Sequence, residues 1–168
     1  MLRHDPLSNP EPLIRRVYSY VAYRIGDGPD AEDITSETFE RAIRYRKSYD
    51  PRKGEPLAWL IGIARRGIEG RPPTLEVAAD LPEQADAREL EDETVRRLAL
   101  SSAVGRLEER DRELIALRYG ADLTARQIAE VLGLKTNAVE VALHRALGRL
   151  RTSLEASGEA APRSAALD

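Results

Sequence analysis

The sequence predicts an all-α protein made of two small helical domains that are joined by a flexible acidic linker. Apolar residues recur every three to four positions through most of the chain, and no alternating β-strand pattern competes with them. The helical pattern breaks at Gly70-Arg71-Pro72-Pro73, and the segment that follows is acidic. With one Phe and one Trp in 168 residues, the core must be aliphatic, which suits helices.

The first domain, residues 1–71, is expected to contain three helices. The first begins at Pro12, a residue favoured at the first helical position, and ends at Gly26. The second is capped by Asp30 and ends near Tyr49. After a loop at Ser48–Glu55, Pro56 begins the third helix. The positions expected on the inward faces, at helical spacing, are Leu13, Val17, Tyr20, Val21, Ile25, Ile34, Thr38, Phe39, Ala42, Ile43, Arg46, Leu57, Leu60, Ile61, Ala64 and Ile68.

The charge distribution supports an acidic linker over residues 72–92. The formal charge of −3 argues against a nucleic-acid binder, because neutralisation of phosphates normally supplies much of the affinity. However, residues 72–100 hold 8 acidic and 3 basic residues, whereas residues 1–71 hold 11 and 13, and residues 101–155 hold 8 and 9. Two mildly basic segments therefore flank an acidic one, as in a two-domain DNA-associated protein.

Residues 93–155 form the second expected domain, which contains a helix-turn-helix, and residues 156–168 are expected to be disordered. Thr124 and Gln127 match a capping box, Gly133 ends that helix, and Thr136 caps the last one. Ala129 is the small residue where the two helices cross. The expected inward positions are Ile128, Leu132, Leu134, Val139 and Ala142; helical spacing is also expected at Val95 and Leu98 in the segment before the motif.

The last helix presents side chains that can enter a major groove. Arg145 and Arg149 are candidates for phosphate contacts, while Glu140 would repel phosphate unless it accepts a hydrogen bond from a cytosine amino group. For each residue taken singly the alternative is an ordinary solvated position, and for His144 that alternative is as favoured as DNA contact. The candidate DNA-binding residues are Lys135, Thr136, Asn137, Glu140, Val141, His144, Arg145 and Arg149.

Several functions are not expected. The chain has no Cys, and His4 and His144 are too far apart in sequence to indicate a metal pair. The sequence contains no Gly-rich phosphate loop and no Gly-x-Ser-x-Gly motif, so no catalytic residue, metal, cofactor or small-molecule substrate is expected. Without a membrane-length apolar run or a signal-peptide pattern, a cytoplasmic location is expected.

Two segments resemble the small extracytoplasmic-function sigma factors. Asp30–Arg66 resembles their second conserved region, with Asp-Ala-Glu-Asp, Thr-Phe and Trp-Leu-x-x-Ile-Ala-Arg. Leu107–Arg151 resembles their fourth region. The two segments follow the family's order and separation. The resemblance implies a sigma factor, a dissociable subunit that brings core RNA polymerase to promoter DNA.

The resemblance implies that the second helix binds the clamp helices of the largest polymerase subunits, while the flap of the polymerase is a further contact. Asp33, Glu37 and Glu40 form an acidic stripe for a basic partner helix, although an ordinary solvated face is the alternative. Ser36 stands where the family more often has Gln. The candidate polymerase-binding residues are Asp33, Ser36, Glu37, Phe39 and Glu40. Members are often restrained by a membrane-bound anti-sigma factor, which is a further candidate partner.

The loop at Ser48–Glu55 matches the family's loop that captures a flipped base of the minus-ten element. The candidate residues there are Tyr49, Arg52 and Lys53, and Arg65 and Arg66 would follow the unwound strand. Trp59 is either a base wedge or, as its apolar stripe favours, part of the core.

Two departures from the family pattern bear on DNA binding. They imply either a lower affinity for DNA or a different sequence preference. The third helix ends early, before Pro72, and Glu140 and Ala142 stand where basic residues are common in the minus-thirty-five reader. The alternative function is a helix-turn-helix regulator that acts without being a polymerase subunit. A hydrolase or nuclease is disfavoured because no catalytic constellation is present.

Overall fold

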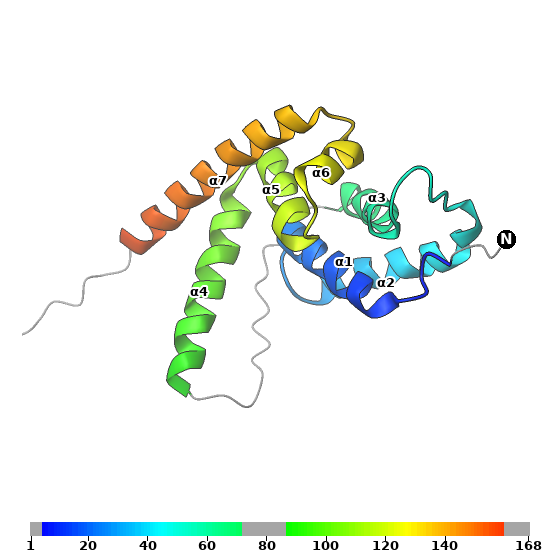
Figure 1. Ribbon diagram of the computed structural model, residues 1–168. Helices are drawn as coiled ribbons and strands as arrows, with labels where there is room; N and C mark the ends of the chain where they lie inside the picture. The colour runs from blue at the N-terminus through cyan, green and yellow to red at the C-terminus, as the bar shows by residue number, and fades with distance from the viewer. Residues whose placement is uncertain (1–4, 72–86, 160–168) are drawn as a thin grey trace, which may run out of the picture.

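The computed structural model describes residues 5–71 and 87–159, and these residues form helices and turns with no strand among them (Figure 1). The all-α prediction is confirmed over this part of the chain. The elements are α1 (Pro10–Ile25), α2 (Pro29–Arg44), the 3₁₀ turn η1 (Arg46–Ser48), α3 (Pro56–Glu69), α4 (Ala87–Arg106), α5 (Glu109–Ile115), the π-helical turn η2 (Ala116–Gly120), α6 (Ala125–Leu132) and α7 (Thr136–Glu159).

Helices α1, α2 and α3 pack together, and each has a proline in its first turn, where the missing N–H costs nothing. Most of the predicted inward positions are buried, but Ile43 is 58% exposed and Arg46 is also exposed. α2 ends at Arg44, earlier than the predicted end near Tyr49, because η1 begins a tighter turn there. Asp30 lies inside the first turn of α2, whose N-cap is Gly28, so the predicted Asp30 cap is wrong.

The helices near the expected linker and tail are longer than predicted. α4 begins at Ala87, within the expected linker 72–92, because its first turns contain strong helix formers such as Ala87, Glu89 and Leu90. α7 continues to Glu159, into the segment 156–168 that was expected to be disordered. Residues 72–86 and 160–168 lie outside the described part of the chain. Along α4, Val95 is 63% and Leu98 is 38% exposed, so these two positions do not reach a core.

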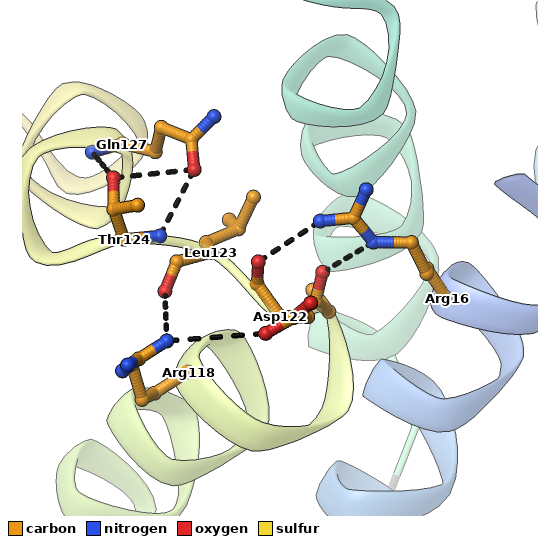
Figure 2. A network of polar contacts seen from close by, with 7 residues as sticks. Arg16, Arg118, Asp122, Leu123, Thr124 and Gln127 are labelled. Carbon is orange, nitrogen blue, oxygen red and sulfur yellow. Dashed lines mark hydrogen bonds and ion pairs between the residues drawn. The ribbon is translucent and has the colours of Figure 1, made fainter.

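The helix-turn-helix is formed by α6 and α7, as predicted. The Thr124 hydroxyl accepts a hydrogen bond from the Gln127 N–H at 3.2 Å, and the Gln127 side chain accepts one from the Thr124 N–H at 2.9 Å (Figure 2). Gly133 ends α6 with φ +66°, a left-handed conformation that glycine adopts without strain. Thr136 is the first residue of α7 and lies inside the helix, so the predicted Thr136 cap is wrong. Leu134 is 41% exposed, although an inward position was predicted.

The two halves of the molecule share one hydrophobic core. Figure 1 shows α5 and α6 lying between α7 and the α1–α3 bundle. Val17, Tyr20 and Leu60 belong to the same buried cluster as Leu117, Ile128 and Val139. A smaller cluster holds α4 against α5 and the middle of α7, through Ala103, Val104, Leu107, Ile115, Ala146 and Leu150. The helix-turn-helix is therefore packed against the N-terminal bundle.

Candidate nucleic-acid and polymerase interfaces

Helix α7 carries the predicted DNA-reading face in a regular arrangement. Asn137, Glu140, Val141 and His144 recur at helical spacing, and all four are exposed, as are Lys135 and Arg145. Thr136 is half-buried at the start of the helix. The opposite face is fixed by burial of Val139, Leu143 and Ala146. The structure therefore places these predicted residues together on one open surface.

Arg149 has a structural partner that was not predicted. Its NH1 group donates to both carboxylate oxygens of Asp111, at 2.8 and 3.0 Å, and the Asp111 side chain is only 9% exposed. A phosphate at Arg149 would have to compete with this buried carboxylate. Arg149 is therefore held by a partner within the protein, and we do not count it among the residues of the DNA-reading face.

The loop between α2 and α3 holds its aromatic residue by two contacts. The Tyr49 ring lies 5.4 Å from the Trp59 ring at an angle of 54°, and its hydroxyl donates to the Gly54 carbonyl at 2.9 Å. Burial, followed by the charges of Glu55 and Asp50, raises the pKa of Tyr49, so the phenol stays protonated. Trp59 is half-buried against the core, as its apolar stripe favoured.

The cations of this region differ in their partners. Arg52 donates to both oxygens of Asp50, at 3.0 and 3.1 Å, and these hydrogen bonds lower the pKa of Asp50. Lys53 and Arg66 are exposed. Arg65 is directed elsewhere, since its Nε lies 2.9 Å from the Glu113 carboxylate of α5. The loop and α3 thus present three exposed cations, one of them already paired.

Helix α2 presents the predicted acidic stripe. Asp33, Ser36 and Glu40 are exposed, whereas Phe39 packs against the core. Glu37 pairs with Arg71 at 2.9 Å, and Glu40 lies 3.8 Å from Arg44. The stripe is therefore open to solvent, but part of its charge is balanced within the chain.

The contacts between the two halves include polar residues that sequence reasoning missed. Glu113 accepts a hydrogen bond from the Tyr20 hydroxyl at 2.9 Å and ion-pairs with Arg24 as well as Arg65. We call these four residues the Glu113 junction. Burial raises the pKa of Tyr20 well above its usual value, so the hydroxyl remains a donor. The only signal in the sequence was Tyr20 itself, because a buried tyrosine hydroxyl needs a partner.

A second polar contact lies beside the Glu113 junction. Arg16 of α1 donates from Nε to the Ala121 carbonyl at 2.8 Å and from NH2 to the Asp122 carbonyl at 2.9 Å (Figure 2). These two carbonyl groups follow the end of η2, where the helix supplies no further backbone N–H group to donate to them. Arg16 thus ties α1 to the turn that precedes the helix-turn-helix.

No group of three or more His, Asp or Glu side chains in residues 5–71 and 87–159 could hold a metal ion. No helix in that part of the chain is long and apolar enough to cross a membrane.

The two halves match two protein families. Residues 11–69 match sigma-70 region 2, and residues 97–150 match sigma-70 region 4. Together these segments contain nearly all of α1–α3, the second half of α4, all of α5 and α6, and the first part of α7.

Individual relatives of the chain are RNA polymerase sigma factors as well. The chain is 32% identical over 143 residues to the ECF RNA polymerase sigma factor BldN of Streptomyces coelicolor, covering 80% of this chain and 54% of BldN. It is 32% identical over 130 residues to the ECF sigma factor RpoE of Cereibacter sphaeroides, covering 72% and 68%. It is also 32% identical over 159 residues to SigD of Mycobacterium tuberculosis, covering 85% and 74%. The chain thus spans about half the length of BldN and more of the other two.

Solved structures agree on the fold. CnrH, in complex with the cytosolic domain of CnrY, superposes with a TM-score of 0.58 at 28% identity, covering 86% of this chain and 81% of CnrH. The sigma factor RpoE of Bartonella quintana, in complex with the anti-sigma factor NepR, superposes with a TM-score of 0.63, covering 85% and 92%; at 16% identity it supports the fold alone. The chain therefore belongs to the extracytoplasmic-function family of RNA polymerase sigma factors.

Proposed function

We propose that each half of this sigma factor reads one promoter element, with domain bounds close to 1–71 and 93–155. The α7 face reads the minus-thirty-five element as duplex, through Asn137, Glu140, His144 and Arg145. A helix of this kind fits the major groove with its N-terminal residues at the base edges. Glu140 would accept a hydrogen bond from cytosine, which makes it a determinant of sequence preference.

The loop between α2 and α3 takes the minus-ten element as an unwound strand. Unstacking a base costs a few kcal/mol, and an aromatic surface with nearby cations offsets that cost. Tyr49 supplies the ring, and Lys53 and Arg66 supply exposed positive charge. Arg52 supplies a further positive charge to the DNA strand once its ion pair with Asp50 is broken.

The acidic stripe of α2 binds the clamp helices of core RNA polymerase. Asp33 and Glu40 are exposed one above the other on the helix, which suits a basic partner helix. The flap of the polymerase receives the C-terminal half. We infer that the protein is a non-catalytic subunit that acts in the cytoplasm, and that an anti-sigma factor is a candidate regulator.

One observation carries this proposal. A single chain combines a region 2 match, whose loop holds a half-buried aromatic residue beside exposed cations, with a region 4 match that has an exposed recognition helix. A free-standing DNA-binding regulator would need only the second. Gel-shift experiments with and without core polymerase separate the two functions. A sigma factor shifts promoter DNA specifically only when core polymerase is present, whereas tight specific binding by the free protein would favour the regulator.

A further inference from the structure

A cavity of about 580 Å³ lies between the second half of α1 and the second half of α4, with Arg112 of α5 at its lining (Figure 1). This volume is within the range of sites that hold a small molecule. The proposed reading of promoter elements and binding of polymerase use none of the residues that line it. The cavity therefore has no role in the function proposed above.

The walls of the cavity are mainly apolar. Ala22 and Tyr23 contribute to the lining from α1, and Leu100 and Val104 contribute from α4. Val104 is buried and the other three residues are half-buried. Burial raises the pKa of Tyr23, so its phenol adds no charge at neutral pH. A surface of this kind suits the aliphatic or aromatic part of a small molecule.

The charged residues of the lining are mostly cations. Four arginines line the cavity, and they come from three helices: Arg24 of α1, Arg97 and Arg106 of α4, and Arg112 of α5. Among the described residues, the lining contains a single carboxylate, that of Asp27, which accepts a hydrogen bond from the Tyr18 hydroxyl. The lining therefore carries an excess of positive charge.

Arg112 is held in place by neutral acceptors. Its NH2 group donates to the carbonyl oxygens of Gly105 at 3.0 Å and Leu107 at 2.9 Å. Its Nε atom is buried and has no hydrogen-bond partner among the described residues. Burial, followed by the charge of Arg24, lowers the pKa of Arg112. A negative charge in the cavity would therefore stabilise the charged form of this guanidinium.

Arg24 also lacks an acceptor at one nitrogen. Its side chain is 8% exposed, and its two terminal nitrogens form ion pairs with Glu109 and Glu113. The Arg24 Nε atom is buried and, like that of Arg112, has no hydrogen-bond partner among the described residues. A buried donor without an acceptor costs free energy. Two such donors belong to side chains that line the same cavity, which favours an acceptor there.

The two arginines of α4 are exposed and accessible to a ligand. Arg106 donates from NH1 to the Ser157 hydroxyl at 2.8 Å, which is a neutral acceptor and leaves the charge of the guanidinium unbalanced by that contact. Guanidinium groups bind carboxylates and phosphates through paired N–H donors. Arg97 and Arg106 are thus suited to the anionic end of a ligand.

We propose that this cavity binds a small amphipathic anion, with its apolar body between α1 and α4 and its carboxylate or phosphate group at the arginines. The apolar walls favour such a ligand over a nucleic-acid backbone, which is polar along its whole length. The inference is independent of the proposed promoter reading, because its test requires neither DNA nor polymerase.

Two substitutions test the two ends of the ligand. Arg97→Gln removes an exposed charge from the lining. Arg96→Gln is the matched control, since Arg96 is the preceding residue of α4, is equally exposed and does not line the cavity. Ser101→Phe places a ring in the space for the apolar body, because Ser101 is a half-buried residue of the lining.

Isothermal titration calorimetry on the full chain measures binding of decanoate, decyl phosphate, decanol, decyltrimethylammonium and inorganic phosphate, all below micelle-forming concentrations. We expect one molecule of decanoate or decyl phosphate to bind per chain, and the better of the two identifies the head group. Decanol, decyltrimethylammonium and inorganic phosphate should each bind at least about tenfold more weakly, because each lacks the charge or the apolar body.

Among the variants, Arg97→Gln should weaken decanoate binding by about threefold, as expected for an exposed ion pair, and Arg96→Gln should not. Ser101→Phe should weaken it by at least about tenfold. Equal affinities of the two arginine variants for decanoate would overturn the inference. Tight binding of decyltrimethylammonium would also overturn it, because the anionic charge would then be irrelevant. If Ser101→Phe loses its helical circular dichroism, the arginine pair alone decides.

Discussion

Asp111 accepts two hydrogen bonds from Arg149 and thereby joins α5 to the recognition helix, 38 residues further along the chain. Because Asp111 is almost buried, the pair aligns α7 against the rest of its half. A residue that looks like a phosphate contact in the sequence therefore has a structural role.

Arg149→Ala is expected to act on stability. It leaves the Asp111 carboxylate without its partner and should lower the free energy of unfolding by about 1–3 kcal/mol. Arg145→Ala is the matched substitution on the exposed face and should change stability by less than ~0.5 kcal/mol. In holoenzyme, the logarithm of the promoter-binding constant falls linearly with the logarithm of the salt concentration. Arg145→Ala should make this slope shallower by about one, and Arg149→Ala should leave it unchanged. Equal changes in slope would show that Arg149 also contacts phosphate.

The capping box of α6 is expected to contribute about 1 kcal/mol. Thr124→Ala removes the acceptor for the Gln127 N–H and should lower the urea midpoint without changing the slope of the transition. Thr152→Ala serves as the control, because Thr152 lies exposed on α7 and only bonds back to Gly148. If the two variants unfold at the same urea concentration, the capping box contributes nothing measurable.

Release of Arg52 from Asp50 is expected to strengthen minus-ten binding. Asp50→Asn removes the charge that holds the guanidinium, so holoenzyme should bind single-stranded minus-ten DNA more tightly, by about threefold. Glu55→Gln removes an equal charge from the same loop without freeing Arg52 and should have a smaller effect. Because hydrogen bonds lower the pKa of Asp50, its carboxylate is ionised at neutral pH and the effect should be constant above that pKa. Equal gains from both variants would indicate general electrostatics.

The acidic stripe of α2 should respond unequally to the loss of its charges. Asp33→Asn is expected to weaken binding to core polymerase by about tenfold, and Glu37→Gln by less, because Arg71 already balances part of the Glu37 charge. Glu11→Gln, on an exposed position of α1, should leave affinity unchanged. Titration of labelled protein with core polymerase measures all three. An effect of Glu11→Gln as large as that of Asp33→Asn would argue against a specific stripe.

Local features were predictable from the sequence, and contacts between distant segments were not. Thr124, Gln127 and Gly133 were identified because a capping box and a left-handed C-terminus depend on neighbouring residues alone. The end of α2 was placed too late because the helical spacing was extended to Arg46, where the chain instead enters the 3₁₀ turn η1. Glu113 was missed because its hydrogen-bond partner Tyr20 lies 93 residues away.

Run-off transcription with core RNA polymerase on a library of genomic DNA fragments tests the central claim most directly. Addition of this protein should give transcripts from a defined set of fragments that share two elements upstream of the start site. Core polymerase alone should not give them. Transcription that is unchanged by the protein, together with tight specific DNA binding in the absence of polymerase, would contradict the account.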